Sequence, residues 1–157
     1  MENKTLKYTN ARLMAVQAVY AHSQSGEDWN KLISRFLLEE VGGSVISDDG
    51  KAEEYISLES ADKELFSALV QYVRDNESNI EETIQATLSD NLKKTMLDSV
   101  LSALLKVGIA EFYIHPNLDT PIILNEYVDI ARSFYEGSEV KIANAVLDKV
   151  AKVLRAQ

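Results

Sequence analysis

The side chains that could carry catalysis or bind a metal are few and scattered in this sequence. Glu111 and His115 stand four residues apart, a spacing that lets two side chains of one helix share a ligand. No third ligand accompanies them in the sequence, so a histidine at a helix end is the better interpretation. Gly42 and Gly43 lack the spacing and the lysine of a phosphate-binding loop, and the chain has no cysteine for a thiolate site. These residues favour a protein that is not an enzyme and that needs no metal or cofactor.

Polar residues near the C-terminus are better candidates for binding a ligand. Asn144 interrupts an apolar stripe, although asparagine prefers helix caps to helix interiors. Lys141 and Lys152 are eleven residues apart, nearly three helical turns, and so share a face. A phosphate-binding patch is one interpretation of this face, and a solvated helix surface is the simpler one.

Most of the sequence has the spacing of apolar residues that is typical of α-helices. The pattern predicts seven of them, over about 11–23, 28–37, 61–73, 79–88, 96–114, 120–134 and 139–154. The helix over 96–114 is apolar nearly all round, which predicts that it is central. An all-α fold follows, since the sequence has few of the turn signals of a β fold.

Cap residues predict where these helices begin and end. Thr9 or Asn10 would cap the first helix and Gly26 would end it. Asp28 would cap the second, and Thr120 the sixth, which has the favoured Pro121 in its first turn. Ser78 or Asn79 would cap the fourth.

Charge is unevenly distributed along the 157 residues, which we interpret as one domain, 1–157. The net charge is −9, but residues 36–64 alone hold nine acidic and two basic side chains. Within them, residues 41–59 favour a solvated acidic loop, although their Asp-Gly pair is also a hairpin signal. Residues 91–157 carry eight basic and eight acidic side chains, so an acidic protein can still present a locally basic surface. The sequence has no apolar run long enough for a membrane span and no secretory leader, so we expect a cytoplasmic protein.

Three segments together resemble one known family. Residues 11–20 read Ala-Arg-Leu-Met-Ala-Val-Gln-Ala-Val-Tyr, and residues 105–112 read Leu-Lys-Val-Gly-Ile-Ala-Glu-Phe. Residues 124–134 read Leu-Asn-Glu-Tyr-Val-Asp-Ile-Ala-Arg-Ser-Phe, followed at 144–149 by Asn-Ala-Val-Leu-Asp-Lys. In order and spacing they are similar to motifs of the bacterial N-utilization substance protein B (NusB) family. The resemblance covers nearly the whole chain except residues 41–59.

The resemblance implies a NusB-like bundle of about seven helices in two packed helical subdomains. It implies a transcription antitermination factor that binds boxA-type single-stranded RNA together with the ribosomal protein NusE. That pair would join the antitermination complex on RNA polymerase, notably on ribosomal RNA operons. A homodimer is one option for the free protein, and no catalysis is implied.

The resemblance and the basic N-terminal residues together predict an RNA-binding surface across the N-terminal segment, the first helix and the junction over 133–144. Its predicted residues are Lys4, Lys7, Tyr8, Arg12, Gln17, Tyr20, Phe134, Ser138, Lys141 and Asn144. We expect Lys4, Lys7 and Arg12 to contact phosphates, and Tyr8 and Phe134 to stack on bases. Other interpretations remain open at this point. Arg12 could form an ion pair within the protein, and Gln17 and Tyr20 could be a polar helix edge and a core aromatic residue.

The sequence also departs from the family pattern. An arginine-rich run before the first helix is replaced by Lys-Tyr-Thr-Asn over residues 7–10, and Ser138 and Ile142 stand where the family has Asp and Phe. An alternative is therefore a NusE-binding interaction module with weak or lost RNA affinity. A second alternative is an accessory to an enzyme, because similar domains are fused to ribosomal RNA methyltransferases. It is disfavoured because no cofactor-binding domain follows in this sequence.

Overall fold

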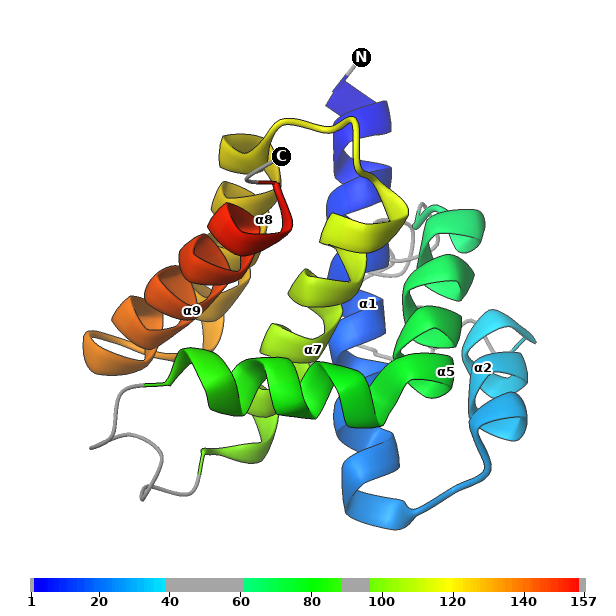
Figure 1. Cartoon of the computed structure of the whole chain (residues 1–157). Coiled ribbons are helices and arrows are strands. Elements are labelled where there is room, and N and C mark those ends of the chain that lie inside the picture. Colours follow the sequence, from blue (N-terminus) through cyan, green and yellow to red (C-terminus); the bar gives the residue numbers. More distant parts are fainter. Residues whose placement is uncertain (1, 39–60, 89–96, 156–157) are drawn as a thin grey trace. The chain divides into compact units, whose positions relative to one another are not determined.

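The computed structural model describes residues 2–38, 61–88 and 97–155, with side chains described from Leu6 onward. These residues form α-helices without any strand, which confirms the predicted all-α class (Figure 1). The helices are α1 (Glu2–Ser25), α2 (Trp29–Leu38), α5 (Lys63–Thr87), α7 (Ser99–Ile114), α8 (Thr120–Phe134) and α9 (Ser138–Leu154). The predicted acidic loop at 41–59 lies outside the described residues. None of the described helices is long and apolar enough to cross a membrane.

The chain divides into two compact units, Met1–Val70 and Gln71–Gln157. The first unit contains α1, α2 and the start of α5, and the second contains the rest of α5 with α7, α8 and α9. This division agrees with the two helical subdomains that the resemblance implies.

In the first unit, α1 begins well before its predicted start. The prediction placed a cap at Thr9 or Asn10, but the helix runs from Glu2, and Asn10 is buried within it. The prediction was wrong because residues 2–10 contain no Gly or Pro to stop a helix, and the weak helix preference of one asparagine does not outweigh burial. Gly26 ends α1 as predicted, at φ 69°, and its N–H donates to the carbonyl oxygen of His22 over 2.8 Å.

The second helix packs on the first around aromatic rings. Asp28 caps α2 as predicted, since its Oδ2 accepts from the Lys31 N–H over 3.1 Å. Trp29 stacks on His22 with ring centroids 3.6 Å apart, and Phe36 stacks on Phe66 with centroids 5.7 Å apart. These stacked pairs join α1 to α2 and α2 to the start of α5.

One long kinked helix, α5, replaces the third and fourth helices of the prediction. Its backbone stays helical except at Asn76, where φ is −131° and ψ is 22° (Figure 1). At the kink the Asn76 Nδ2 donates to the Tyr72 carbonyl oxygen over 3.0 Å. The predicted boundary at Ser78 or Asn79 thus lies two to three residues after the kink, and because the two helical stretches are joined there, the described residues form six helices and not seven.

The second unit is built around α7, as predicted from its apolar sequence. Residues 101 and 103–112 of α7 are buried, and α8 and α9 contact both α7 and each other (Figure 1). Gly108 allows a close approach, because a Cβ there would lie 3.0 and 3.2 Å from the two Leu147 methyl groups on α9. Thr120 is the first residue of α8 and Asp119 is its N-cap, one residue before the predicted position.

Candidate nucleic-acid interface

The predicted RNA-binding residues of the first unit lie along α1. Lys7 is exposed and Tyr8 is half-buried, while the side chain of Lys4 lies outside the described residues. Gln17 is exposed and Tyr20 is 37% exposed, one helical turn further on. Lys7 and Tyr20 are separated by thirteen residues, or roughly 20 Å of helix. The helix therefore spreads these side chains along its length instead of gathering them.

Arg12 differs from the other α1 candidates because it is buried, with 6% of its surface exposed. Arg12 also has an interaction partner within the protein. The ion pair and the contact with a phosphate both stay predictions for Arg12.

The predicted residues of the second unit gather where α8 ends and α9 begins. Phe134 is the last residue of α8 and is 45% exposed. Ser138, Lys141 and Asn144 are exposed and follow one another along α9 at steps of about one turn. Asn144 thus lies beside the buried stripe of α9 and does not interrupt it. Residues 134–144 thus carry an exposed aromatic ring, followed along the chain by an exposed hydroxyl, an ammonium and an amide group.

Tyr135, which directly follows α8, was missed by the sequence prediction. Its hydroxyl donates a hydrogen bond to Oδ2 of Asp98, and its ring lies 6.4 Å from that of Phe134 at a tilt of 54°. The hydrogen bond from Tyr135 holds the pKa of the Asp98 carboxyl below its usual value. Burial, and then the hydrogen bond to Asp98, raise the pKa of Tyr135. Asp98 and Tyr135 are 37 residues apart in the sequence, so no local pattern indicates their contact.

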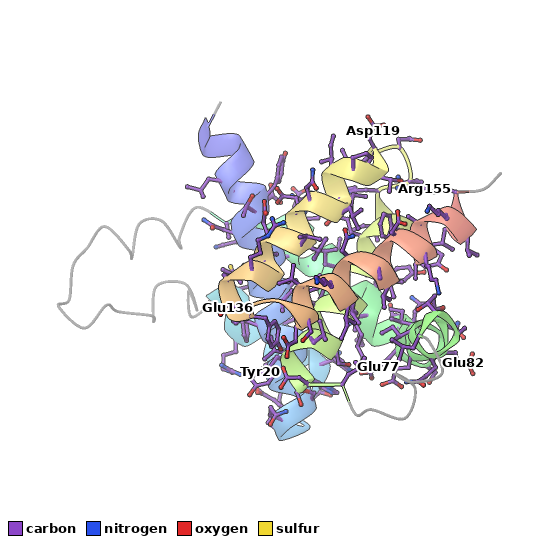
Figure 2. All side chains as sticks on the ribbon, turned by 90° about the vertical axis from the view of Figure 1, so that its left-hand side faces the viewer. Tyr20, Glu77, Glu82, Asp119, Glu136 and Arg155 are labelled. Atoms are coloured by element: carbon purple, nitrogen blue, oxygen red, sulfur yellow. The ribbon has the colours of Figure 1, made fainter. Side chains whose placement is uncertain are left out.

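Charges near this turn are mostly negative. Asp98, Glu136 and Glu139 contribute carboxylates, whereas Lys141 contributes an ammonium group. Figure 2 shows Glu136 at the turn between α8 and α9, away from Asp119 and Arg155 at the other end of these helices. The surface around Phe134 is therefore suited to a base more than to a phosphate.

Glu111 and His115, the pair considered for metal binding, serve the packing of α7 against α8. Glu111 is fully buried, and its two carboxylate oxygens contact the Tyr127 hydroxyl at 2.6 Å and the His115 Nδ1 at 2.8 Å. His115 is the C-cap of α7, as the helix-end interpretation predicts. Across the described parts of the chain, no three His, Cys, Asp or Glu side chains come close enough to hold a metal ion.

Two cationic side chains of the second unit, Arg155 and Lys106, form polar contacts within it. The Arg155 guanidinium donates to the carbonyl oxygens of Leu118 and His115 over 2.6 and 2.9 Å, and to the Thr120 Oγ1 over 3.0 Å. Lys106 is buried on α7 and lies 3.0 Å from a Glu77 oxygen and 3.1 Å from a Glu81 oxygen. These contacts join elements within the unit, and in the part of the chain that the structure describes every buried side-chain nitrogen and oxygen has a hydrogen-bond partner.

The sequence model of the NusB family matches residues 9–152 of this chain. The chain belongs to the NusB family. The match begins after Lys4, Lys7 and Tyr8, so three of the predicted RNA contacts precede it. It includes the predicted residues Arg12, Gln17, Tyr20, Phe134, Ser138, Lys141 and Asn144.

Named relatives of the NusB family cover almost the whole chain. The transcription antitermination protein NusB of Hyphomonas neptunium is 38% identical over 146 residues, which are 93% of this chain and 90% of the relative. That of Mesorhizobium japonicum is 33% identical over 147 residues, 94% of this chain and 90% of the relative. The solved structure of T. maritima NusB is 19% identical, covers 92% of this chain and 89% of its own, and has a TM-score of 0.64. The similarity to the T. maritima structure supports the NusB fold for this chain.

Proposed function

We propose that this protein is a transcription antitermination factor that binds boxA-type single-stranded RNA together with NusE and so supports transcription of ribosomal RNA operons. The family and the names of its relatives support the antitermination role. The observation that carries RNA binding is the exposed Phe134 ring at the end of α8, followed on the first two turns of α9 by the exposed Ser138, Lys141 and Asn144. Exposed aromatic rings beside polar side chains are the usual means by which proteins bind unpaired bases.

The two groups of residues have different proposed roles. Lys4 and Lys7 contact phosphates, with Arg12 as a further candidate, and Tyr8 stacks on a base. Phe134 stacks on a base, while Ser138, Lys141 and Asn144 supply hydrogen bonds. Gln17 and Tyr20 add contacts further along α1. The protein acts by binding and not by catalysis, as part of the RNA polymerase antitermination complex in the cytoplasm, and a homodimer stays an option for the free protein.

A NusE-binding module with weak RNA affinity is the second candidate function. The observations that favour it are the carboxylates of Asp98, Glu136 and Glu139 near Phe134 and the burial of Arg12. Each lowers the attraction for a polyanion relative to a surface rich in free arginines.

Titration of a fluorescent boxA-like RNA, with and without purified NusE and at two salt concentrations, tests these functions. Binding that NusE strengthens and salt weakens is the result expected of the antitermination factor. Tight binding of NusE without any RNA binding would instead support the interaction module.

Matched variants identify the surface in the same titration. Phe134→Ala is paired with Ile122→Ala, which removes another exposed apolar side chain, 48% exposed, from the same helix. Lys7→Ala is paired with Lys31→Ala, which removes an exposed lysine from α2. We expect the first variant of each pair to weaken RNA binding and the second to leave it unchanged. Equal effects within both pairs would contradict the proposed surface.

A further inference from the structure

The turn between α8 and α9 is attached to α7 through one tyrosine side chain. Tyr135 is the C-cap of α8, with an extended backbone (φ −137°, ψ 165°), and its N–H donates to the Ala131 carbonyl oxygen over 2.9 Å. This conformation directs the side chain away from the helix it follows. Its hydroxyl reaches the Asp98 carboxylate, 37 residues earlier in the chain.

The acceptor of this hydrogen bond is itself held in place. Asp98 is the N-cap of α7, and its Oδ2 also accepts from the Val100 N–H over 3.2 Å. The Asp98 carbonyl oxygen accepts from the Ser102 N–H over 2.9 Å, so both its backbone and its side chain take part in the first turn of α7. Because α7 is the buried central helix of the unit, Tyr135 is tied to its most enclosed element.

Other hydrogen bonds described at the turn are local and do not reach another element. The Lys141 N–H donates to the Gly137 carbonyl oxygen over 3.2 Å, and the Ser138 Oγ lies 3.3 Å from a Glu139 oxygen. Gly137 has φ 72° and ψ −111°, a conformation that glycine adopts easily and other residues rarely do. Such a turn has many accessible conformations when its side chains are not anchored.

We infer that Tyr135 is a positioning residue, whose hydrogen bond to Asp98 holds the α8–α9 turn so that the neighbouring Phe134 ring is preset to stack on an unpaired RNA base. The two rings contact each other at 6.4 Å, so fixing the Tyr135 ring restricts the Phe134 ring as well. Ordering a binding side chain in advance lowers the entropy lost on binding and raises affinity. This inference rests on the proposed RNA binding and adds a residue that acts on it indirectly.

The ligand of this preset ring is a base and not a phosphate. Asp98 is ionised when it accepts the hydrogen bond, and Glu136 and Glu139 add further negative charge close by. These charges oppose a phosphate but have little effect on stacking between a base and a neutral ring. The contribution of Tyr135 to affinity is therefore expected to be insensitive to salt.

The test combines Tyr135→Phe, which removes only the hydroxyl, with Asp98→Ser, which keeps a helix cap but is too short to reach the tyrosine. Each is titrated with the boxA-like RNA in the presence of NusE, and we expect each to lower affinity by about threefold with an unchanged salt slope. The double variant is expected to lose no more than either single one, since all remove the same contact. Tyr113→Phe, at another exposed tyrosine of this unit, is the control and is expected to bind as the parent protein does.

Amide hydrogen exchange gives a second measurement that does not depend on RNA. Tyr135→Phe is expected to speed exchange in the peptide that contains residues 134–138, without a change in α7 beyond its first turn. Unchanged exchange there would overturn the inference, because the turn would then be ordered without the hydrogen bond.

Three results separate failure of this inference from failure of the proposed function. If Tyr135→Phe binds RNA normally while Tyr135→Ala does not, the ring itself contacts RNA and the positioning role is wrong. If exchange accelerates but affinity changes only in Phe134→Ala, the turn needs no anchor and the RNA-binding proposal stands. If neither Phe134→Ala nor Lys7→Ala weakens RNA binding, the proposed function fails and this inference fails with it.

Discussion

The residues expected to bind RNA are presented in opposite ways by α1 and by the turn between α8 and α9. On α1 they are distributed over several turns of one long helix, and their exposure ranges from the open Lys7 to the buried Arg12. Around the α8–α9 turn they all fall within residues 134–144 and are exposed, with an aromatic ring at the helix end and polar groups on the following two turns. The first group includes the exposed cation Lys7, whereas in the second group Lys141 lies among the carboxylates of Asp98, Glu136 and Glu139.

This difference indicates that affinity for RNA has two separable components. Cations on α1 would attract phosphates and release counterions, so their contribution falls as salt rises. A ring among carboxylates would contribute by stacking, which depends little on salt. Substitutions on α1 and at the α8–α9 turn can therefore remove the charge contribution and the stacking contribution to RNA affinity separately.

Arg12→Ala is expected to have the largest effect, and on folding more than on RNA. Removing a buried and engaged arginine loses its packing and leaves its surroundings unsatisfied, so we expect the free energy of unfolding to fall by about 2 kcal/mol or more. Urea unfolding measures this, with Lys7→Ala as the exposed control on the same helix. A stable Arg12→Ala protein with weakened RNA binding would contradict this expectation and support Arg12 as a phosphate contact.

Phe134→Ala measures how much stacking at the α8–α9 turn contributes to RNA affinity. Loss of one stacked base is expected to lower RNA affinity by about tenfold, and a plot of log affinity against log salt should keep its slope. Fluorescence anisotropy at several salt concentrations gives both quantities. A lower slope in this variant would mean that the turn also contacts phosphate.

Lys7→Ala is expected to change the salt dependence of RNA binding, which Phe134→Ala leaves unchanged. Loss of one phosphate contact to single-stranded RNA should reduce the salt slope by about 0.7 and weaken binding only a few-fold at moderate salt. The same titrations measure it, with Lys31→Ala for comparison. An unchanged slope would remove Lys7 from the proposed surface and break the division of roles.

The smallest effect concerns the pH dependence of the anchored turn. The hydrogen bond from Tyr135 lowers the pKa of Asp98 in the folded protein, so its stabilisation is present above the unfolded pKa of about 4 and is lost as pH falls through the folded pKa. Because Asp98 is exposed, we expect Tyr135→Phe to cost under about 1 kcal/mol near pH 7. Urea unfolding of both proteins near pH 7 and near pH 3 should show the difference shrinking at the lower pH. A difference that grows there would assign the effect to another group.

Local signals were sufficient to predict most helices. Gly26, Asp28 and the apolar run of α7 act through their own neighbours in the chain, so their roles can be read from spacing alone. The kink at Asn76 shows where this fails. The apolar pattern indicates a helix boundary, and Asn76 does leave the helical conformation there, but the two helical stretches are joined at a kink, where the Asn76 side chain donates to the Tyr72 carbonyl oxygen.

Contacts between distant residues could not be predicted in this way. The sequence indicated Phe134 by its resemblance to a known motif, but it did not indicate Tyr135, whose role depends on Asp98. The apolar neighbours of Arg12 on α1 raised a role within the protein as an alternative to RNA contact, but they could not decide between the two. Candidate residues are thus found from motifs, whereas their exposure and anchoring require the folded chain.

The stack of Trp29 on His22 has a practical consequence for studying how the protein unfolds. Trp29 is the chain's single tryptophan and lies in the first unit, so its fluorescence reports on that unit alone. The second unit holds the stacked pair Tyr72 and Tyr113. Tyrosine signals come from both units, since Tyr8 and Tyr20 lie in the first. If both units melt together, indole emission and the tyrosine signals follow one curve in a denaturant titration, whereas a second step in the tyrosine signals alone would show that the units melt in succession.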